Sequence, residues 1–221
     1  MFLILDFLIS YFIISAGNII GTVSSFIFSG GNAENYIAEL AMDMNPLKVV
    51  VMVILAPIFE ELIFRKLMLD RISKYGEKMA IFFTAFAFGL LHQNLFQFFY
   101  AFALGYLFAY IYLRTGRLGY CIALHGIINF MGSIIAPWIL SLLDMDTLTA
   151  LETAAPEEML TLLAGILPEL LLYLLYAMVL FALSITGLVL LIVLREKIIW
   201  KNAGSPLPQG KVVKTVYVNA G

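Results

Sequence analysis

Long apolar runs are the feature that most constrains what this chain can fold into. The last of them, PELLLYLLYAMVLFALSITGLVLLIVL at 168–194, contains one charged residue. About 20 apolar residues in a helix cross the hydrocarbon core of a bilayer, which is about 30 Å thick. Over the whole chain, 62% of the 221 residues are hydrophobic and 13% are charged, against about 25% charged in a typical globular protein. The chain is therefore predicted to be an integral membrane protein with several spans.

Six transmembrane helices are predicted, near 2–28, 48–69, 79–92, 95–113, 119–142 and 168–194. The third is short, and the polar stretch HQNLFQ follows it, so we expect this helix to be buried within protein. Residues 156–166, before Pro168, are interpreted as an interfacial or partly inserted helix, and a seventh crossing there stays open. The predicted fold class is thus an all-α polytopic membrane helix bundle.

The positive charges predict how the bundle is oriented. With six spans, the connections after spans two and four lie on the same side as both termini. Almost all Lys and Arg residues fall on that side, namely Arg71, Lys74, Lys78, Arg114, Arg117, Arg195, Lys197 and Lys201. The other side has Lys48 among many Asp and Glu residues. Because cytoplasmic loops carry an excess of Lys and Arg, both termini are predicted to be cytoplasmic, in a bacterial-type plasma membrane.

One domain is expected to account for most of the chain. Residues 1–200 are predicted to form a single transmembrane helical domain with its motif-bearing core at about 48–140. Residues 201–221 are predicted to be a polar cytoplasmic tail, in which 211–219 could form a short strand. A net charge of −2 gives no reason to expect a nucleic-acid partner.

Two small features refine this picture. Cys121 is the only cysteine, which excludes an intrachain disulfide. Gly17 and Gly21, in SAGNIIG, are expected to form a small-residue helix contact within the chain, with dimerisation as the alternative. The sequence does not predict an oligomeric state.

Polar side chains inside the apolar spans are the candidates for chemistry. On spans two, three and five they are Glu60, Glu61, Arg65, His92, His125 and Asn129. The two histidines are the only ones in the chain. Each ionisable residue at mid-membrane costs about 2.5–3.5 kcal/mol on insertion scales. Three such residues on one helix are therefore expected to be retained for a function.

Helical spacing divides the charged residues of span two into two roles. Glu61 and Arg65 are four residues apart, which favours an ion pair on one helix face. Glu60 points about 100° away from Glu61 and has no basic residue one turn to either side. We therefore expect it to meet His92 and His125, which lie at a similar depth. The alternatives are structural: a helix-stabilising ion pair, histidines bonded to backbone carbonyls, and an amide that only joins helices.

Three short motifs resemble those of the CPBP family. EELIFR (60–65), FGLLH (88–92) and HGIIN (125–129) follow its pattern of EExxxR, FxxxH and HxxxN or HxxxD. This is the family of CAAX-processing endopeptidases and bacteriocin-processing intramembrane proteases, also called Abi. The resemblance covers about residues 48–140 and departs from the pattern at none of the motif positions.

The resemblance implies an all-helical intramembrane endopeptidase acting on a membrane-associated peptide or protein. Glu60 with His92 would activate the attacking water as general base. His125 with Asn129 would hold that water or stabilise the oxyanion. A buried carboxylate suits a general base, and amide and imidazole donors stabilise a developing oxyanion well in an apolar site.

The supporting residues implied by the resemblance are Glu61, Arg65 and Phe88, the last one packing beneath the imidazole of the second motif. One Glu with two His is also a catalytic zinc ligand set. No cofactor is favoured, but a zinc ion would be the alternative, and its ligands would be Glu60, His92 and His125.

Two other functions stay open. One is a non-proteolytic role of the same family in bacteriocin immunity or scaffolding. The other is a proton-coupled transporter that uses the same buried Glu and His. The sequence shows no internal repeat, which counts against a transporter.

Overall fold

The structure is a computed structural model that describes residues 2–35, 42–43 and 45–201. Every regular element in these residues is helical. The α-helices are α1 (Phe2–Phe28), α3 (Pro46–Val49), α4 (Ala56–Glu61), α5 (Asp70–Ile72), α6 (Glu77–Leu91), α7 (Leu95–Thr115), α8 (Leu118–Phe130), α9 (Ala136–Ser141), α10 (Met145–Leu151) and α11 (Pro156–Leu194). The prediction of an all-α fold is therefore confirmed for the described residues.

Short π-helical and 3-10 segments join several of these helices. The π-helical segments are η1 (Val50–Leu55), η2 (Leu62–Leu69) and η4 (Met131–Ile135), and the 3-10 turns are η3 (Ser73–Tyr75) and η5 (Arg195–Lys197). As a result, one continuous helix runs over 46–72 and another over 118–141.

Prolines explain where two of the π-helical segments lie. Pro57 stands in the first turn of α4, directly after η1, and Pro137 stands in the first turn of α9, directly after η4. Proline has no N–H to donate and its ring collides with the preceding turn. A wider π turn before the proline relieves that clash and allows the helix to continue.

Four helices are long and apolar enough to cross a membrane, by length and composition: Leu3–Phe28, Leu95–Thr115, Leu118–Ser141 and Pro156–Lys197. They correspond to four of the six predicted spans. The continuous helix at 46–72 contains the charged motif, and α6 has 15 residues, which is shorter than a span usually needs. The number of crossings stays a prediction.

The last helix corrects one expectation. The stretch 156–166 is not a separate helix, because α11 runs without interruption from Pro156 to Leu194 and contains Pro168 in its interior. A single proline removes one backbone hydrogen bond. In a helix of 39 residues the hydrogen bonds of the turns on both sides of Pro168 keep the helix continuous.

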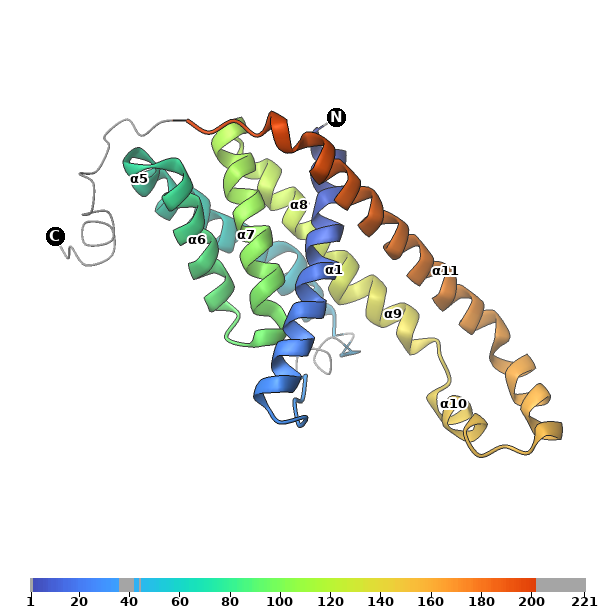
Figure 1. Cartoon of the computed structure of the whole chain (residues 1–221). Coiled ribbons are helices and arrows are strands. Elements are labelled where there is room, and N and C mark those ends of the chain that lie inside the picture. Colours follow the sequence, from blue (N-terminus) through green and yellow to red (C-terminus); the bar gives the residue numbers. More distant parts are fainter. Residues whose placement is uncertain (1, 36–41, 44, 202–221) are drawn as a thin grey trace.

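The long helices run alternately up and down (Figure 1). One end of the bundle holds the start of α1, the turn between α5 and α6, the turn between α7 and α8, and the end of α11. The other end holds the turn between α6 and α7. From that end α9, α10 and the first part of α11 extend away from the bundle as an arm (Figure 1).

Helix α1 packs between α7 and α11 through close backbone contacts. A Cβ atom added at Gly17 would lie 2.5 Å from the Tyr100 Cα, and one added at Gly21 would lie 2.6 Å from the Leu95 carbonyl oxygen. The predicted small-residue contact is therefore confirmed within the chain. On the opposite side of α1, Gly187 of α11 lies directly against the Leu8 carbonyl oxygen.

Aromatic and aliphatic side chains from the helix at 46–72 and from α6, α7 and α8 form the core around the motifs. Its largest cluster consists of Leu69, Ala80, Ile81, Leu104, Phe108, Ala109, Ile111, Tyr112, Cys121, Leu124 and Ile128. The division of the chain at residue 200 stays a prediction, and the strand predicted at 211–219 lies outside the described residues.

Candidate active site

Glu61 and Arg65 form the ion pair predicted from their spacing. The Arg65 Nε lies 2.8 Å from Glu61 Oε2, and both side chains are fully buried. The guanidinium carbon of Arg65 also lies 5.1 Å from the centre of the Phe88 ring and 5.9 Å from that of Phe108. These contacts surround the charge with favourable groups, as a buried charge requires.

Glu61 has a second partner that helical spacing did not predict. Its Oε1 lies 3.0 Å from His125 Nδ1. A carboxylate only accepts hydrogen bonds, so Nδ1 of His125 carries the proton in this bond. In the neutral imidazole Nε2 is then an acceptor. Glu61 therefore joins Arg65 on its own helix to His125 on α8, and it orients the imidazole.

Glu60 lies on the other side of the same imidazole. Its Oε2 is 3.9 Å from His125 Nε2, which is a close approach but too long for a hydrogen bond. The Glu60 side chain is 22% exposed, and its Oε2 atom is buried without a hydrogen-bond partner among the residues that the structure describes. Of the two adjacent carboxylates, this one is available to a further group.

His92 is at the C-terminal end of α6, where its Nδ1 lies 3.0 Å from the Phe88 carbonyl oxygen. A carbonyl also only accepts, so Nδ1 is the protonated nitrogen and Nε2 is left to accept. The Phe88 ring packs against the His92 ring with 5.2 Å between their centres, as predicted, and against the His125 ring at 5.8 Å. Phe88 thus contacts both imidazoles.

Asn129 makes a contact between helices. Its Nδ2 donates to the Met52 carbonyl oxygen over 2.9 Å, which joins α8 to the π-helical segment η1. The amide group has a second N–H, so the bond to Met52 does not use all of its donors. A role for Asn129 toward a substrate stays a prediction.

The three candidate metal ligands do not form a ligand set. Among the residues that the structure describes, no three His, Cys, Asp or Glu side chains are placed to hold one metal ion. Glu60 and His125 approach each other, whereas His92 Nδ1 is bonded to the Phe88 carbonyl of its own helix and its Nε2 is left to accept. The zinc alternative, with Glu60, His92 and His125 as ligands, stays a prediction.

A polar network next to the second motif was missed by sequence reasoning. Asn94 caps α7 by accepting from the Gln97 backbone N–H, and its Nδ2 donates to the His92 carbonyl and to Gln97 Oε1. Gln97 Nε2 in turn donates to the Tyr100 hydroxyl over 2.8 Å. The signal was available in the polar stretch HQNLFQ between two apolar helices.

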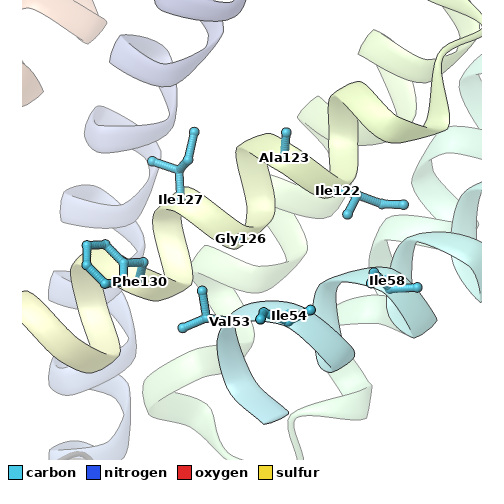
Figure 2. Close-up of a pocket in the computed structure, with 8 residues that line it drawn as sticks. All are labelled: Val53, Ile54, Ile58, Ile122, Ala123, Gly126, Ile127 and Phe130. Atoms are coloured by element: carbon cyan, nitrogen blue, oxygen red, sulfur yellow. The ribbon is translucent and has the colours of Figure 1, made fainter. Parts of the chain in front are cut away.

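An apolar groove of about 440 Å³ lies between two of the helices that carry the motifs (Figure 2). It runs between η1 and α4 on one side and α8 on the other. Its lining residues are Val53, Ile54, Ile58, Ile122, Ala123, Gly126, Ile127 and Phe130. Gly126 keeps the two walls close, since a Cβ atom there would lie 3.0 Å from the Val53 carbonyl oxygen. The helices that form the groove also carry Glu60, Glu61 and His125.

Comparisons with known proteins give the same assignment as the motifs. Residues 43–131 match a family model described as "Type II CAAX prenyl endopeptidase Rce1-like". The protein named "Putative membrane peptidase YdiL" of Bacillus subtilis (strain 168) is 33% identical over 117 residues, which are 50% of this chain and 47% of that protein. The match thus spans about half the length of this curated relative. No solved structure matches the chain.

The residues matched by the family model include all three motifs, from Glu60 to Asn129. The family is supported both by the model and by the curated membrane peptidase. Residues 43–131, with the three motifs, are therefore similar to the CPBP family, which is the family that the motifs resemble.

Proposed function

We propose that this protein is an intramembrane endopeptidase that hydrolyses a peptide bond of a membrane-associated protein or peptide. The observation that supports it most is the contrast between the adjacent carboxylates. Glu61 is fully buried and bonded to Arg65 and His125, whereas Glu60 is partly exposed and its buried Oε2 has no hydrogen-bond partner among the described residues. A free carboxylate beside an oriented imidazole is what a general base in hydrolysis requires.

In this mechanism Glu60 takes a proton from a water molecule as the water oxygen attacks the carbonyl carbon. His92, through its accepting Nε2, shares in activating the water, and His125 Nε2 holds it. The second N–H of Asn129 donates to the oxyanion of the tetrahedral intermediate. The C–N bond then breaks, and the amine leaves with the proton that Glu60 had taken. The water is activated without a metal ion.

The proposed topology has six crossings, since the helices alternate in direction (Figure 1). Both termini are placed in the cytoplasm, because most Lys and Arg residues lie in the connections on that side. A membrane-associated substrate would place its scissile bond at Glu60 and its apolar anchor along the groove beside α8 (Figure 2). The matched family is described as a CAAX prenyl endopeptidase, so a farnesyl group is the first anchor to test.

The test is cleavage of quenched fluorescent peptides by the purified protein in liposomes. One probe is a farnesylated peptide that ends in a CAAX sequence, and the other carries the same peptide on an apolar transmembrane segment. We expect the wild type to cleave at least one probe. Glu60→Gln and His92→Ala should lower the rate at least about 100-fold, within the usual range for a lost general base.

Glu158→Gln is the matched control, because Glu158 is an exposed carboxylate in the first turn of α11. It should cleave like the wild type. Full activity of Glu60→Gln would contradict the proposal. The immunity function would be supported instead by a different result: the protein cleaves neither probe, and both the wild type and Glu60→Gln protect a host cell from a toxin.

A further inference from the structure

The short turn between α6 and α7 carries His92, one of the proposed catalytic residues. His92 is the C-cap of α6, and Asn94 is the N-cap of α7. Gln93, between them, has a backbone φ of 57°, the one positive φ of a non-glycine residue in the described ranges. Such a conformation is uncommon and persists only where the surroundings impose it. The backbone that carries His92 therefore needs contacts that hold the turn in this shape.

The Asn94 side chain supplies such contacts. Its Oδ1 accepts from the Gln97 backbone N–H over 2.9 Å, which caps α7. Its Nδ2 donates to the His92 carbonyl oxygen over 2.7 Å and to Gln97 Oε1 over 2.8 Å. The last carbonyls of a helix have no partner within the helix, so the bond to His92 satisfies one that α6 leaves open. The amide thus uses its acceptor oxygen and both of its donor hydrogens.

The imidazole of His92 is only half-buried, so burial alone does not hold it in one orientation. Its Nδ1 donates to the Phe88 carbonyl oxygen, and the rings of Phe88 and Tyr100 lie 5.2 Å and 6.5 Å from its own ring. Gln97 accepts from Asn94 and donates to the Tyr100 hydroxyl over 2.8 Å. Asn94 is therefore connected to His92 in two ways, directly at the backbone and through Gln97 and the Tyr100 ring.

We infer that Asn94 is a positioning residue of the active site, which holds the backbone and the ring of His92 so that Nε2 faces the water it activates. The inference rests on the proposed role of His92. A cap needs only an acceptor oxygen at this position, which Asp and Ser provide about as well as Asn. The two amide donors are not needed for the cap, and both of them bind groups that contact or hold the surroundings of His92.

The kinetic test separates the cap from the two donors. Asn94→Asp and Asn94→Ser both keep an oxygen that accepts from the Gln97 N–H, but neither can make all three bonds of the amide. With the probe that the wild type cleaves, we expect kcat to fall about 10- to 100-fold in both variants with KM unchanged, which is the scale for a misplaced catalytic group. Thermal unfolding should stay close to that of the wild type, because the cap is kept. Since only Asp adds a charge, a fall in both variants is not an effect of charge.

Asn45→Asp is the matched control. Asn45 is also an N-cap, in an exposed turn before α3, where its Oδ1 accepts from the Leu47 backbone N–H over 2.8 Å. The same substitution there should leave kcat unchanged. A kcat equal to that of the wild type in Asn94→Asp or in Asn94→Ser would overturn the inference while leaving the proposed function intact.

A second measurement does not depend on cleavage. The chain has two histidines, so labelling with ¹⁵N-histidine gives NMR signals from two imidazoles, and the signals lost in His92→Ala belong to His92. With the rings neutral, we expect one protonated and one unprotonated nitrogen for His92, because its Nδ1 donates to the Phe88 carbonyl. In Asn94→Asp and Asn94→Ser the two ¹⁵N shifts of His92 should move toward each other, because both tautomers are then populated. His125, bonded to Glu61, should keep its shifts.

The two measurements have separate outcomes. His92 shifts that either variant of Asn94 leaves in place would overturn the inference. If the wild type cleaves neither probe, the proposed function fails, and the NMR result still decides whether Asn94 holds the His92 ring.

Discussion

At the scale of single residues, the adjacent glutamates 60 and 61 have different environments although both are in one turn of helix. Neighbouring side chains on a helix point about 100° apart. Glu61 therefore faces the interior, where it is fully buried against Arg65 and His125. Glu60 is 22% exposed and its Oε2 approaches the far nitrogen of His125. The same chemical group thus serves as a structural anchor at one position and is available for chemistry at the next.

The buried ion pair predicts a large effect of removing one partner. Arg65→Met leaves the Glu61 charge buried with His125 alone, so we expect the free energy of unfolding to fall by about 3–5 kcal/mol. The double variant Glu61→Gln/Arg65→Met should regain part of this loss, because no unpaired charge is then buried. Chemical denaturation in detergent micelles measures both.

Lys66→Met is the control for this experiment. Lys66 pairs with Asp70 at the surface, where its side chain is 55% exposed. Exposed ion pairs contribute little, so its unfolding should be close to that of the wild type. An Arg65→Met protein as stable as the wild type would show that the pair has no structural role.

At the scale of helices, glycines of α1 allow this helix to pack closely against α7. Gly17 faces the backbone of Tyr100, and Gly21 faces the carbonyl oxygen of Leu95. Both contacts need a residue without a side chain. Helix α1 is outside the residues matched by the family model, 43–131, yet it contacts the backbone of Tyr100, whose ring lies 6.5 Å from that of His92.

Gly17→Ala is expected to separate these two helices. The new methyl group would meet backbone atoms of Tyr100 that cannot rotate away, and overpacking of this kind typically costs about 1–3 kcal/mol. Thermal unfolding in detergent measures the loss, and cleavage of the probe should decrease with it. Gly119→Ala on α8 is the control, because among the described residues nothing lies within 4 Å of a Cβ atom there. Equal losses in both variants would contradict this explanation.

Helix α10, outside the apolar spans, predicts a local pH dependence. Asp144 caps it, and hydrogen bonds from the Thr147 hydroxyl and backbone lower the pKa of the Asp144 carboxyl below its ordinary value of 3.8. The pKa of Asp144 is lower in the folded state than in the unfolded state. The cap therefore stabilises the helix at pH values above the pKa of the unfolded state, and this stabilisation is lost as the pH falls through the pKa of the folded state.

Thr147→Ala removes the hydroxyl donor and should raise the pKa of Asp144 toward its ordinary value. Titration of a ¹³C-labelled Asp144 carboxyl by NMR measures this change. Thr149→Ala is the control, because the Thr149 hydroxyl bonds to the Met145 carbonyl instead. A titration midpoint that Thr147→Ala leaves in place would contradict the assigned cause.

At the scale of the whole molecule, the basic residues gather at one end of the bundle. The turns before α6 and after α7 meet there, and Arg114 forms an ion pair with Glu77 across them. The segment after α11 packs against the same end. The Lys201 backbone N–H donates to the Glu77 carboxylate, and the Trp200 ring packs on the Tyr110 ring. The acidic connection through α10 lies at the opposite end of the long helices (Figure 1).

This separation of charge predicts the topology in the membrane. Reporter proteins inserted after Lys74 and after Gly116 should both report the cytoplasm, and a reporter after Glu152 should report the other side. The reason is the positive-inside rule, because Lys and Arg flank the first two positions and acidic residues flank the third. A reporter after Lys74 on the same side as that after Glu152 would contradict the six-span topology.

Much of this protein could be predicted from its sequence, because the decisive relations act along single helices. Apolar length and low charge determined the all-helical membrane class. A spacing of four residues determined the pair of Glu61 and Arg65, and the same spacing placed Phe88 beneath His92. The three motifs predicted the family whose model matches residues 43–131.

Only the tertiary structure decided which side chains meet between helices. It placed His125 between Glu60 and Glu61, directed the Asn129 amide to the Met52 carbonyl, and carried α11 straight through Pro168. It also brought Tyr100, which belongs to no motif, to the same site. The physical reason is that helical periodicity relates residues on one helix, whereas contacts between helices depend on crossing angles and close approaches that packing alone determines.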